Sequence, residues 1–458
     1  MHQAKNKTTQ TQLYEYLNNH VGQLLQTKHG QNTTTASTDI ALNTYDDLGR
    51  LKTKKKGNLP TSTYTYNVRS WMKSITGSLF SETLYYNESY AGNSPCYNGN
   101  ISAMSWKAGN ETLRGYHFTY DGLSRITKAD YLLNGSLNDS YKIPSISYDK
   151  HGNITALQRW GKTSFGYDMV DNLTMGYIGN QLSYVTDAAV KTPNVALGLN
   201  DFKDASSATS GEYAYNRNGA MSKDLNKGIS NIAYNSLNLP AQLTINGVTN
   251  IYKYAADGTK LKVTRGSDVT DYVGNKIYEN GSLKYIFFDG GYIDTPSNTY
   301  HFYIQDHQGN NRVVATGTGT VVQRNHYYPF GMTFGEIGAS EQDKQAYKYN
   351  GKELDRKNGL NLYDYSARYM EPALGRFTTM DPLAEKHYEI SPYAYVMNNP
   401  MRYADPLGMD TITVNLKGQE MNRISASGED IIMANLDEVV ITAPSKQTSS
   451  SSFMTAMN

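Results

Sequence analysis

The chain has 458 residues, a length that suits two or three ordinary domains or one long all-β unit. Its 43 Lys and Arg residues against 42 Asp and Glu give a net charge of +1, so no bulk electrostatic field draws in DNA or an anionic membrane. With 39 Tyr and 39 Gly against 11 Phe, the composition favours strands and turns over long helices.

A single cysteine, Cys96, excludes an internal disulfide and a cysteine-built zinc site, and we expect no cofactor. No apolar run is long enough to cross a bilayer. Residues 1–12 are polar, and we expect them to be disordered; they lack the apolar core of a secretory signal. Export would therefore use another route, or the chain begins inside a longer parent protein.

From Tyr14 onward a short unit recurs, in which Tyr and then Asp or Asn are followed by Gly or Asn and by an apolar residue. Copies recur every 19 to 21 residues over several stretches, a period that predicts a repeat architecture. The copies begin at Tyr45-Asp46, Tyr66-Asn67, Tyr86-Asn87, Tyr120-Asp121, Tyr148-Asp149, Tyr167-Asp168, Tyr215-Asn216, Tyr234-Asn235 and Tyr254.

Each unit predicts a β-hairpin. Tyr ends one strand, Asp or Asn accepts backbone N–H bonds in the turn, and Gly, as at Gly49 and Gly152, supplies a positive φ. The basic and apolar residues that follow, such as Arg50-Leu51, start the return strand. One hairpin is too small to be stable alone, so successive units should pair into a long antiparallel strip. On pattern alone, a flat meander or a propeller stays open.

Along each strand the side chains should alternate between two faces, and Tyr213 and Tyr215 then share one face, as do Tyr252 and Tyr254. We favour cross-strand aromatic packing as their role. A lining that contacts a captive polypeptide is the alternative.

Residues 186–211 break the period and suggest an irregular insertion, and 336–346 suggest a polar link. His301, His307 and His326 lie near a change of pattern between 271 and 331, but none stands in a metal-ligand spacing such as H-E-x-x-H. We therefore interpret these histidines as structural.

The stretch from Tyr347 to Met409 contains six fixed pieces in order: YNGKE at 349–353, YDYSARY at 363–369, GRF at 375–377, MDPL at 380–383, SPYAYVMNNP at 391–400 and ADPLGM at 404–409. With the upstream repeats, it resembles the RHS (YD-repeat) family at its RHS-repeat-associated core. The resemblance implies an all-β fold, with the strip of hairpins wound into a partial, cocoon-like shell. It implies a division into a YD-repeat shell at 13–335, the core at 336–409 and a short variable tail at 410–458.

The resemblance also implies a function: the encapsulating scaffold of a polymorphic toxin used in interbacterial competition, secreted or at the cell surface. In similar proteins the core cleaves its own chain once. Asp381 and Asp405 match the paired aspartates, Arg368 matches the associated arginine, and the cut would fall between Met409 and Asp410. Two close carboxyls can share one proton and work as acid and base.

Two departures bear on that expectation. Met409 stands where Leu is usual, a nearly isosteric change, and Tyr369 stands where some relatives carry an acid after the arginine. The alternative for Asp381 and Asp405 is that Asp-Pro simply caps two turns. The chain would be an enzyme at most in this sense, an aspartic-type autoprotease with no external substrate.

After Met409 only 49 residues remain, with one strand-like segment at 436–442 and a serine run at 449–452. They are too few and too polar for a typical toxin domain. The expected partners are the chain's own C-terminal cargo segment or missing N-terminal repeats, an immunity protein, or a cell-surface glycan, and not nucleic acid. The competing function is a cell-surface module that binds carbohydrate or a protein without catalysis.

Overall fold

The computed structural model describes residues 11–163, 165–189, 201–206, 208, 210–335 and 343–409, and the backbone of two short strands beyond Asp410. About half of these residues form antiparallel strands, and the helical residues occur in short 3-10 turns. The all-β, antiparallel architecture expected from the sequence is confirmed. No described helix is long and apolar enough to cross a membrane.

The first eleven strands pair in chain order, each with its neighbours in the sequence, and give one 11-stranded sheet. Its strands are β1 (Gln12–Asn18), β2 (Leu24–Gln31), β3 (Thr38–Tyr45), β4 (Leu51–Lys55), β5 (Ser62–Tyr66), β6 (Met72–Thr76), β7 (Phe80–Tyr85), β8 (Ala103–Ala108), β9 (Arg114–Tyr120), β10 (Ile126–Leu133) and β11 (Ser136–Leu137).

Two further sheets continue the same meander, one of four strands and one of 13. The four are β12 (Ser145–Tyr148), β13 (Ile154–Thr163), β14 (Gly166–Ile178) and β15 (Gln181–Asp187). The 13 are β16 (Tyr213–Tyr215), β17 (Met221–Asp224), β18 (Ile229–Tyr234), β19 (Pro240–Ile245), β20 (Val248–Tyr254), β21 (Lys260–Arg265), β22 (Asp268–Val273), β23 (Lys276–Glu279), β24 (Ser282–Phe288), β25 (Gly291–Asp294), β26 (Thr299–Gln305), β27 (Asn311–Thr316) and β28 (Val321–Arg324).

The segment from 343 to 409 is built differently, from very short strands and single 3-10 turns. In chain order these are η2 (Tyr349–Gly351), β29 (Glu353–Asp355), η3 (Lys357–Gly359), β30 (Leu362–Asp364), β31 (Tyr369–Glu371), β32 (Arg376–Phe377), η4 (Ala384–Lys386), η5 (Val396–Asn398) and β33 (Tyr403–Ala404). The backbone of β34 (Ile412–Asn415) pairs with β33, and that of β35 (Glu420–Arg423) pairs with β34. The rest of the predicted tail, including 436–442 and 449–452, lies outside the described residues.

The hairpin turn has the structure that the repeat predicts. The Asp46 Oδ1 atom accepts hydrogen bonds from the backbone N–H groups of Leu48 at 3.0 Å and Arg50 at 2.9 Å. Gly49 has a φ of 76° and Gly152 has a φ of 79°, which confirms the positive φ expected at that turn position. Serine also takes the position, because Ser124 has a φ of 64° in the turn after Tyr120.

In several units the tyrosine links its hairpin to the preceding one. Its hydroxyl donates to the backbone carbonyl of the first strand residue after the previous turn: Tyr66 to Leu51 at 2.9 Å and Tyr148 to Ile126 at 2.5 Å. The arginine of the previous turn lies over the same ring, as Arg125 does over Tyr148 at 4.6 Å. The repeat is therefore a unit of contact between hairpins as well as a turn.

Two local expectations are wrong. Tyr167-Asp168 does not form a turn, because both residues lie inside β14, where Asp168 pairs with Gly161. The copy is incomplete, since Asp171 stands where the glycine would be needed. Residue 12, placed in the disordered N-terminus, begins β1; residues 1–10 lie outside the described residues.

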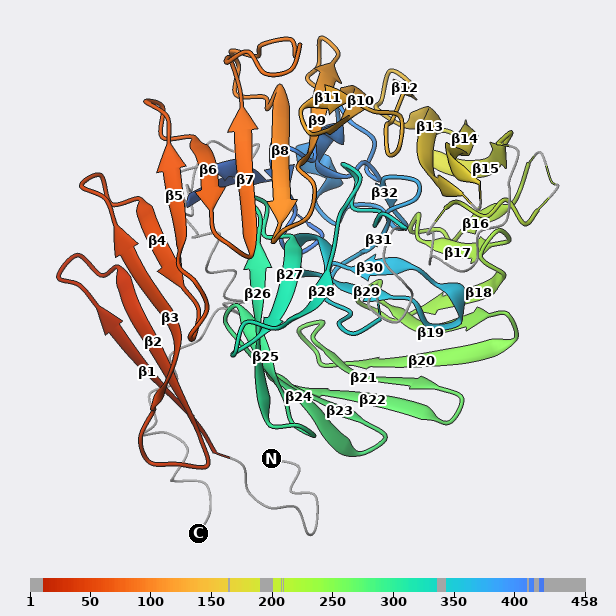
Figure 1. Ribbon diagram of the computed structural model, residues 1–458. Helices are drawn as coiled ribbons and strands as arrows, with labels where there is room; N and C mark the ends of the chain where they lie inside the picture. Colours follow the sequence, from red (N-terminus) through yellow and green to blue (C-terminus); the bar gives the residue numbers. More distant parts are fainter. Residues whose placement is uncertain are drawn as a thin grey trace, which may run out of the picture.

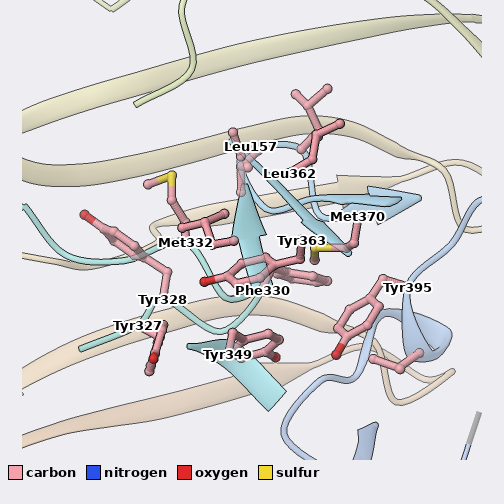
Figure 2. Close-up of a cluster of buried hydrophobic side chains, with 14 of the residues drawn as sticks. Leu157, Tyr327, Tyr328, Phe330, Met332, Tyr349, Leu362, Tyr363, Met370 and Tyr395 are labelled. Atoms are coloured by element: carbon pink, nitrogen blue, oxygen red, sulfur yellow. The ribbon is translucent and has the colours of Figure 1, made fainter. Parts of the chain in front are cut away.

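The strip of sheets curls around the segment from 343 to 409, which lies on its inner side (Figure 1). One buried cluster joins aromatic and aliphatic side chains of the strip to those of this segment, among them Leu157, Tyr327, Phe330, Tyr349 and Tyr363 (Figure 2). The tyrosine hydroxyls there bond to backbone carbonyls, Tyr349 to Pro329 at 2.9 Å and Tyr363 to Gly331 at 3.0 Å. Burying such rings requires a partner for each hydroxyl, and these carbonyls supply it.

The four tyrosines predicted to share faces all point to the inner side of the strip. Their rings are buried in this cluster or pack against it: Tyr213, Tyr215, Tyr252 and Tyr254. The inner side of the strip is thus occupied at these tyrosines by the chain's own core segment. Cross-strand and core packing is their observed environment.

Candidate functional site

The two Asp-Pro-Leu triplets occupy turns of unequal construction. In the second, Asp405 Oδ1 accepts the backbone N–H groups of Leu407 at 3.2 Å, Gly408 at 2.6 Å and Met409 at 3.1 Å. Gly408 has a φ of 74° there. A Cβ on Gly408 would lie 3.0 Å from the backbone nitrogen of Arg368, so only glycine fits without a shift.

The first triplet is less enclosed. Asp381 Oδ1 accepts only the N–H of Leu383, at 2.8 Å, among the hydrogen bonds of that turn, and the Asp381 N–H donates to the carbonyl of Pro392 at 2.9 Å. The side chain of Asp381 is 18% exposed, whereas that of Asp405 is 2% exposed. The two carboxyls therefore differ in hydration and in the number of N–H donors that face them.

Arg368 joins the two turns. It stands just before β31, and its Nη2 atom lies 2.8 Å from Asp381 Oδ2 and 3.0 Å from Asp405 Oδ2. Its Nε–H donates to the carbonyl of Gly408 at 2.5 Å, and its Nη1–H donates to that of Pro392 at 3.2 Å. One guanidinium thus holds both carboxylates and the backbone beside each of them.

One face of the Arg368 guanidinium contacts an apolar ring. The guanidinium carbon lies 3.6 Å from the centroid of the Phe377 ring, which stacks on it. Burial lowers the pKa of Arg368 from its usual value, and the carboxylates of Asp405 and Asp381 act in the opposite direction. An arginine has so high an ordinary pKa that the group stays charged.

The structure therefore brings together four of the five residues singled out in the sequence: Arg368, Asp381, Asp405 and Met409. Met409 belongs to the group through its backbone N–H, which donates a hydrogen bond to Asp405 Oδ1. Asp410 lies outside the described residues. Two carboxyls that share one guanidinium nitrogen can carry acid–base chemistry, since their mutual repulsion favours a state with one proton.

Tyr369, the departure that follows Arg368, takes no part in this arrangement. Successive side chains of a strand point to opposite faces, and the Tyr369 ring lies against Tyr252, with the centroids 6.5 Å apart. The sequence reasoning missed Phe377 and Lys352, whose Nζ donates to the carbonyl of Pro406. Both belong to the quoted motifs, but motif letters carry no information on which side chains meet.

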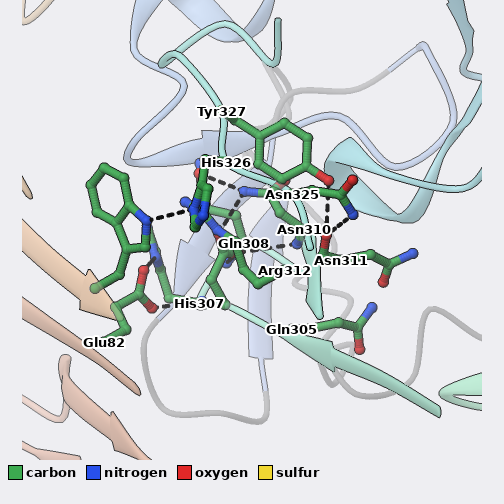
Figure 3. Close-up of polar contacts among 12 residues, drawn as sticks. Glu82, Gln305, His307, Gln308, Asn310, Asn311, Arg312, Asn325, His326 and Tyr327 are labelled. Atoms are coloured by element: carbon green, nitrogen blue, oxygen red, sulfur yellow. Dashed lines mark hydrogen bonds and ion pairs between the residues drawn. The ribbon is translucent and has the colours of Figure 1, made fainter. Parts of the chain in front are cut away.

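The three histidines make hydrogen bonds to neighbouring groups, and Figure 3 shows His307 and His326. The His307 ring lies between Glu82 Oε1 at 3.1 Å and the carbonyl of Met401 at 3.3 Å. Burial lowers the pKa of His307, but the charge and hydrogen bond of Glu82, the Asp306 carboxylate and the Met401 carbonyl together raise it, and the net direction is upward. His326 accepts from the indole N–H of Trp106 and contacts Glu111. Within the described part of the chain, no three His, Cys, Asp or Glu side chains are placed to hold a metal ion.

No family model matches the chain. In sequence it is similar to the tRNA nuclease WapA of Bacillus subtilis, with 26% identity over 308 residues, 64% of this chain and 11% of that protein. The toxin subunit YenC1 of Yersinia entomophaga is 34% identical over 103 residues, 22% of this chain and 10% of that subunit. Salivary gland surface protein 1 of Aedes aegypti is 36% identical over 120 residues, 26% of this chain and 3% of that protein. The chain thus spans only a small part of each relative's length.

Among solved structures, the Photorhabdus luminescens Tc holotoxin pore matches with a TM-score of 0.67 and 17% identity, over 88% of this chain and 21% of the other. The TcdB2-TccC3 crystal structure matches with a TM-score of 0.65 and 17% identity, over 87% and 21%. At this identity the likeness establishes the fold alone, that of a Tc toxin shell. The sequence relatives include a tRNA nuclease and a toxin subunit, so the chain is similar in sequence to parts of toxin-related proteins.

Proposed function

We propose that this chain is an encapsulating scaffold segment of an RHS-type polymorphic toxin, used against neighbouring bacteria, and that it cuts itself once after Met409. The sequence similarity to WapA and YenC1 supports the toxin-related part. The observation that carries the cleavage is the convergence of Asp381, Asp405 and the Gly408 carbonyl on Arg368. The protein would work outside the producing cell, secreted or at its surface.

The unequal turns assign a role to each aspartate. Both carboxyls share Arg368, but Asp405 faces three backbone N–H groups where Asp381 faces one, so we take Asp405 as the member that stays ionised. Asp381 accepts one N–H, and its side chain reaches solvent, so it is the member that takes up and releases the proton. Water then adds across the Met409–Asp410 bond, leaving a carboxyl group on Met409 and an amine on Asp410.

The site is made by the fold itself, since Arg368 and Asp405 lie 37 positions apart in the chain. Cleavage is intramolecular, and its rate should not depend on protein concentration. The pH profile should rise and fall, because one carboxyl has to be protonated and the other ionised.

The test is to incubate the purified full chain at mildly acidic to neutral pH and to follow its intact mass. We expect a C-terminal peptide that begins at Asp410, and none from Asp381→Asn or Asp405→Asn. Asn keeps the size of Asp and an oxygen that accepts the turn N–H groups, and thermal unfolding of each variant checks that it folds. Asp257→Asn, in an exposed turn of the strip, is the matched control and should cleave normally.

Non-enzymatic scission at Asp-Pro bonds is the rival explanation of a fragment. It would cut before Pro382 or Pro406, so N-terminal sequencing separates it from the proposed cut. A wild-type chain that keeps its intact mass refutes self-cleavage and leaves both aspartates as turn residues. An intact chain that binds glycans would instead favour the surface-binding module.

A further inference from the structure

Lys352, in the YNGKE motif, lies next to the site, and the proposed cleavage has given it no role. Its backbone N–H donates to the Tyr349 carbonyl and its own carbonyl accepts from Lys348, both at 2.9 Å, so the residue is fixed at the end of η2. Its half-buried side chain passes the Tyr365 ring, with Nζ 5.5 Å from the ring centroid. Nζ then donates to the carbonyl of Pro406 at 2.5 Å.

The turn that carries Asp405 is thereby held by two cations. Lys352 binds the carbonyl of Pro406, and Arg368 binds that of Gly408, on either side of Leu407. The N–H groups of the same turn converge on Asp405 Oδ1 from within. The backbone around Asp405 is therefore fixed through both its donors and its acceptors.

The electrostatic interactions of Lys352 also involve Asp405. Burial lowers the pKa of Lys352, while the carboxylates of Asp405 and Asp364 raise it, so the ammonium and Asp405 influence each other. The other ionisable groups around Asp405 include Arg368, Asp381 on the same guanidinium nitrogen, and the phenols of Tyr365 and Tyr395. An ammonium beside a carboxyl favours its ionised form.

We propose that Lys352 is a positioning residue of the cleavage site: it fixes the Pro406 carbonyl and holds Asp405 as the carboxylate, which leaves the transferable proton to Asp381. This inference rests on the proposed self-cleavage. Lys352 acts through Asp405 and the turn and does not touch the bond that is cut.

Three substitutions separate its two contributions. Lys352→Met removes both the charge and the hydrogen bond while keeping the length of the side chain. Lys352→Gln offers a neutral donor, and Lys352→Arg keeps the charge. Lys357→Met, which removes an exposed lysine of the same segment, is the matched control.

The first readout is the rate of release of the Asp410 peptide across pH. We expect Lys352→Met to slow it at least tenfold and to move the acidic limb of the profile to higher pH, with Lys352→Arg close to wild type. Lys352→Gln should restore part of the rate but keep the displaced limb. An unchanged rate and profile in Lys352→Met, or a wild-type profile in Lys352→Gln, overturns the inference while self-cleavage stands.

The second readout does not require cleavage. In protein labelled with 13C at the Asp carboxyl carbons, the Asp405 signal is assigned by its loss in Asp405→Asn and is followed by NMR over pH. We expect Asp405 to take up its proton at a higher pH in Lys352→Met than in wild type. The same titration in both proteins overturns the inference, and a wild type that never cleaves refutes the proposed function separately.

Discussion

At the scale of single residues, Asp224 shows how burying a carboxyl group without a sufficient partner makes the free energy of unfolding depend on pH. It ends β17, is 2% exposed, and burial raises its pKa to about 6, with Lys227 acting to lower it and Glu371 to raise it. The folded chain therefore binds this proton more tightly than the unfolded chain, whose Asp has a pKa of about 3.9. The free energy of unfolding should fall as pH rises from about 4 to about 6, and stay lower above that.

We therefore expect Asp224→Asn to be more stable than wild type at pH 7, by on the order of 1–3 kcal/mol, because Asn never has to ionise in the core. The gain should vanish below about pH 4, where Asp224 is protonated in both states. Chemical denaturation at several pH values measures it, with the exposed Asp268→Asn as control. A gain that is the same at pH 3 and pH 7 would mean that repacking, and not ionisation, is responsible.

At the scale of the hairpin, the turn can be tested at its glycine. Gly49→Val and Gly152→Val force a β-branched residue into positive φ and should lower the free energy of unfolding by about 1–3 kcal/mol each. Gly49→Asn should be milder, because Asn238 holds the same turn position with a φ of 58°. Denaturant unfolding measures this, and Val variants that melt like wild type would show that the assigned hairpin register is wrong.

The hydroxyl that ties one hairpin to the next is a separate test. Tyr148→Phe keeps the ring under Arg125 but leaves the carbonyl of Ile126 without this donor. We expect a loss of about 1 kcal/mol, the usual net value of one such bond. Tyr388→Phe is the control, since Tyr388 is 89% exposed. Equal stabilities of the two variants would assign the role of the repeat tyrosine to its ring alone.

The features that could be predicted from the sequence are those formed by residues close together in the chain. The residues of each tight turn lie within four positions of one another, so Tyr-Asp and Gly were enough to predict these turns. The copies at Tyr86 and Tyr167 lack the glycine and misled: the connection after Tyr86 runs to β8 at Ala103, and Tyr167 lies inside β14. The positive φ of Ser124 was not predicted, because serine seldom adopts positive φ. The partner of Lys352 lies 54 positions away, and no spacing in the sequence indicates that its ammonium meets the Pro406 carbonyl. Arg368 was found only through resemblance, for the same reason.

At the scale of the whole molecule, the strip begins with a strand that has a neighbour on one side. Among the described residues β1 pairs with β2 alone, and Tyr16 and Leu17 are 65% and 54% exposed. The N–H of Asn32 donates to the carbonyl of Thr11, and antiparallel bonding alternates along the strand. The backbone groups of Gln12, Tyr14 and Tyr16 therefore point away from β2, and such an edge promotes association.

We expect the isolated chain to associate through this edge, so that its sedimentation coefficient rises with concentration. Tyr16→Pro should abolish the effect, because it removes an outward N–H without breaking a bond to β2. Tyr16→Ser removes the exposed ring but keeps the N–H, and should retain part of the association. A wild type that stays a highly soluble monomer at every concentration contradicts the open edge, and equal loss in both variants would assign the association to the tyrosine ring instead of the strand.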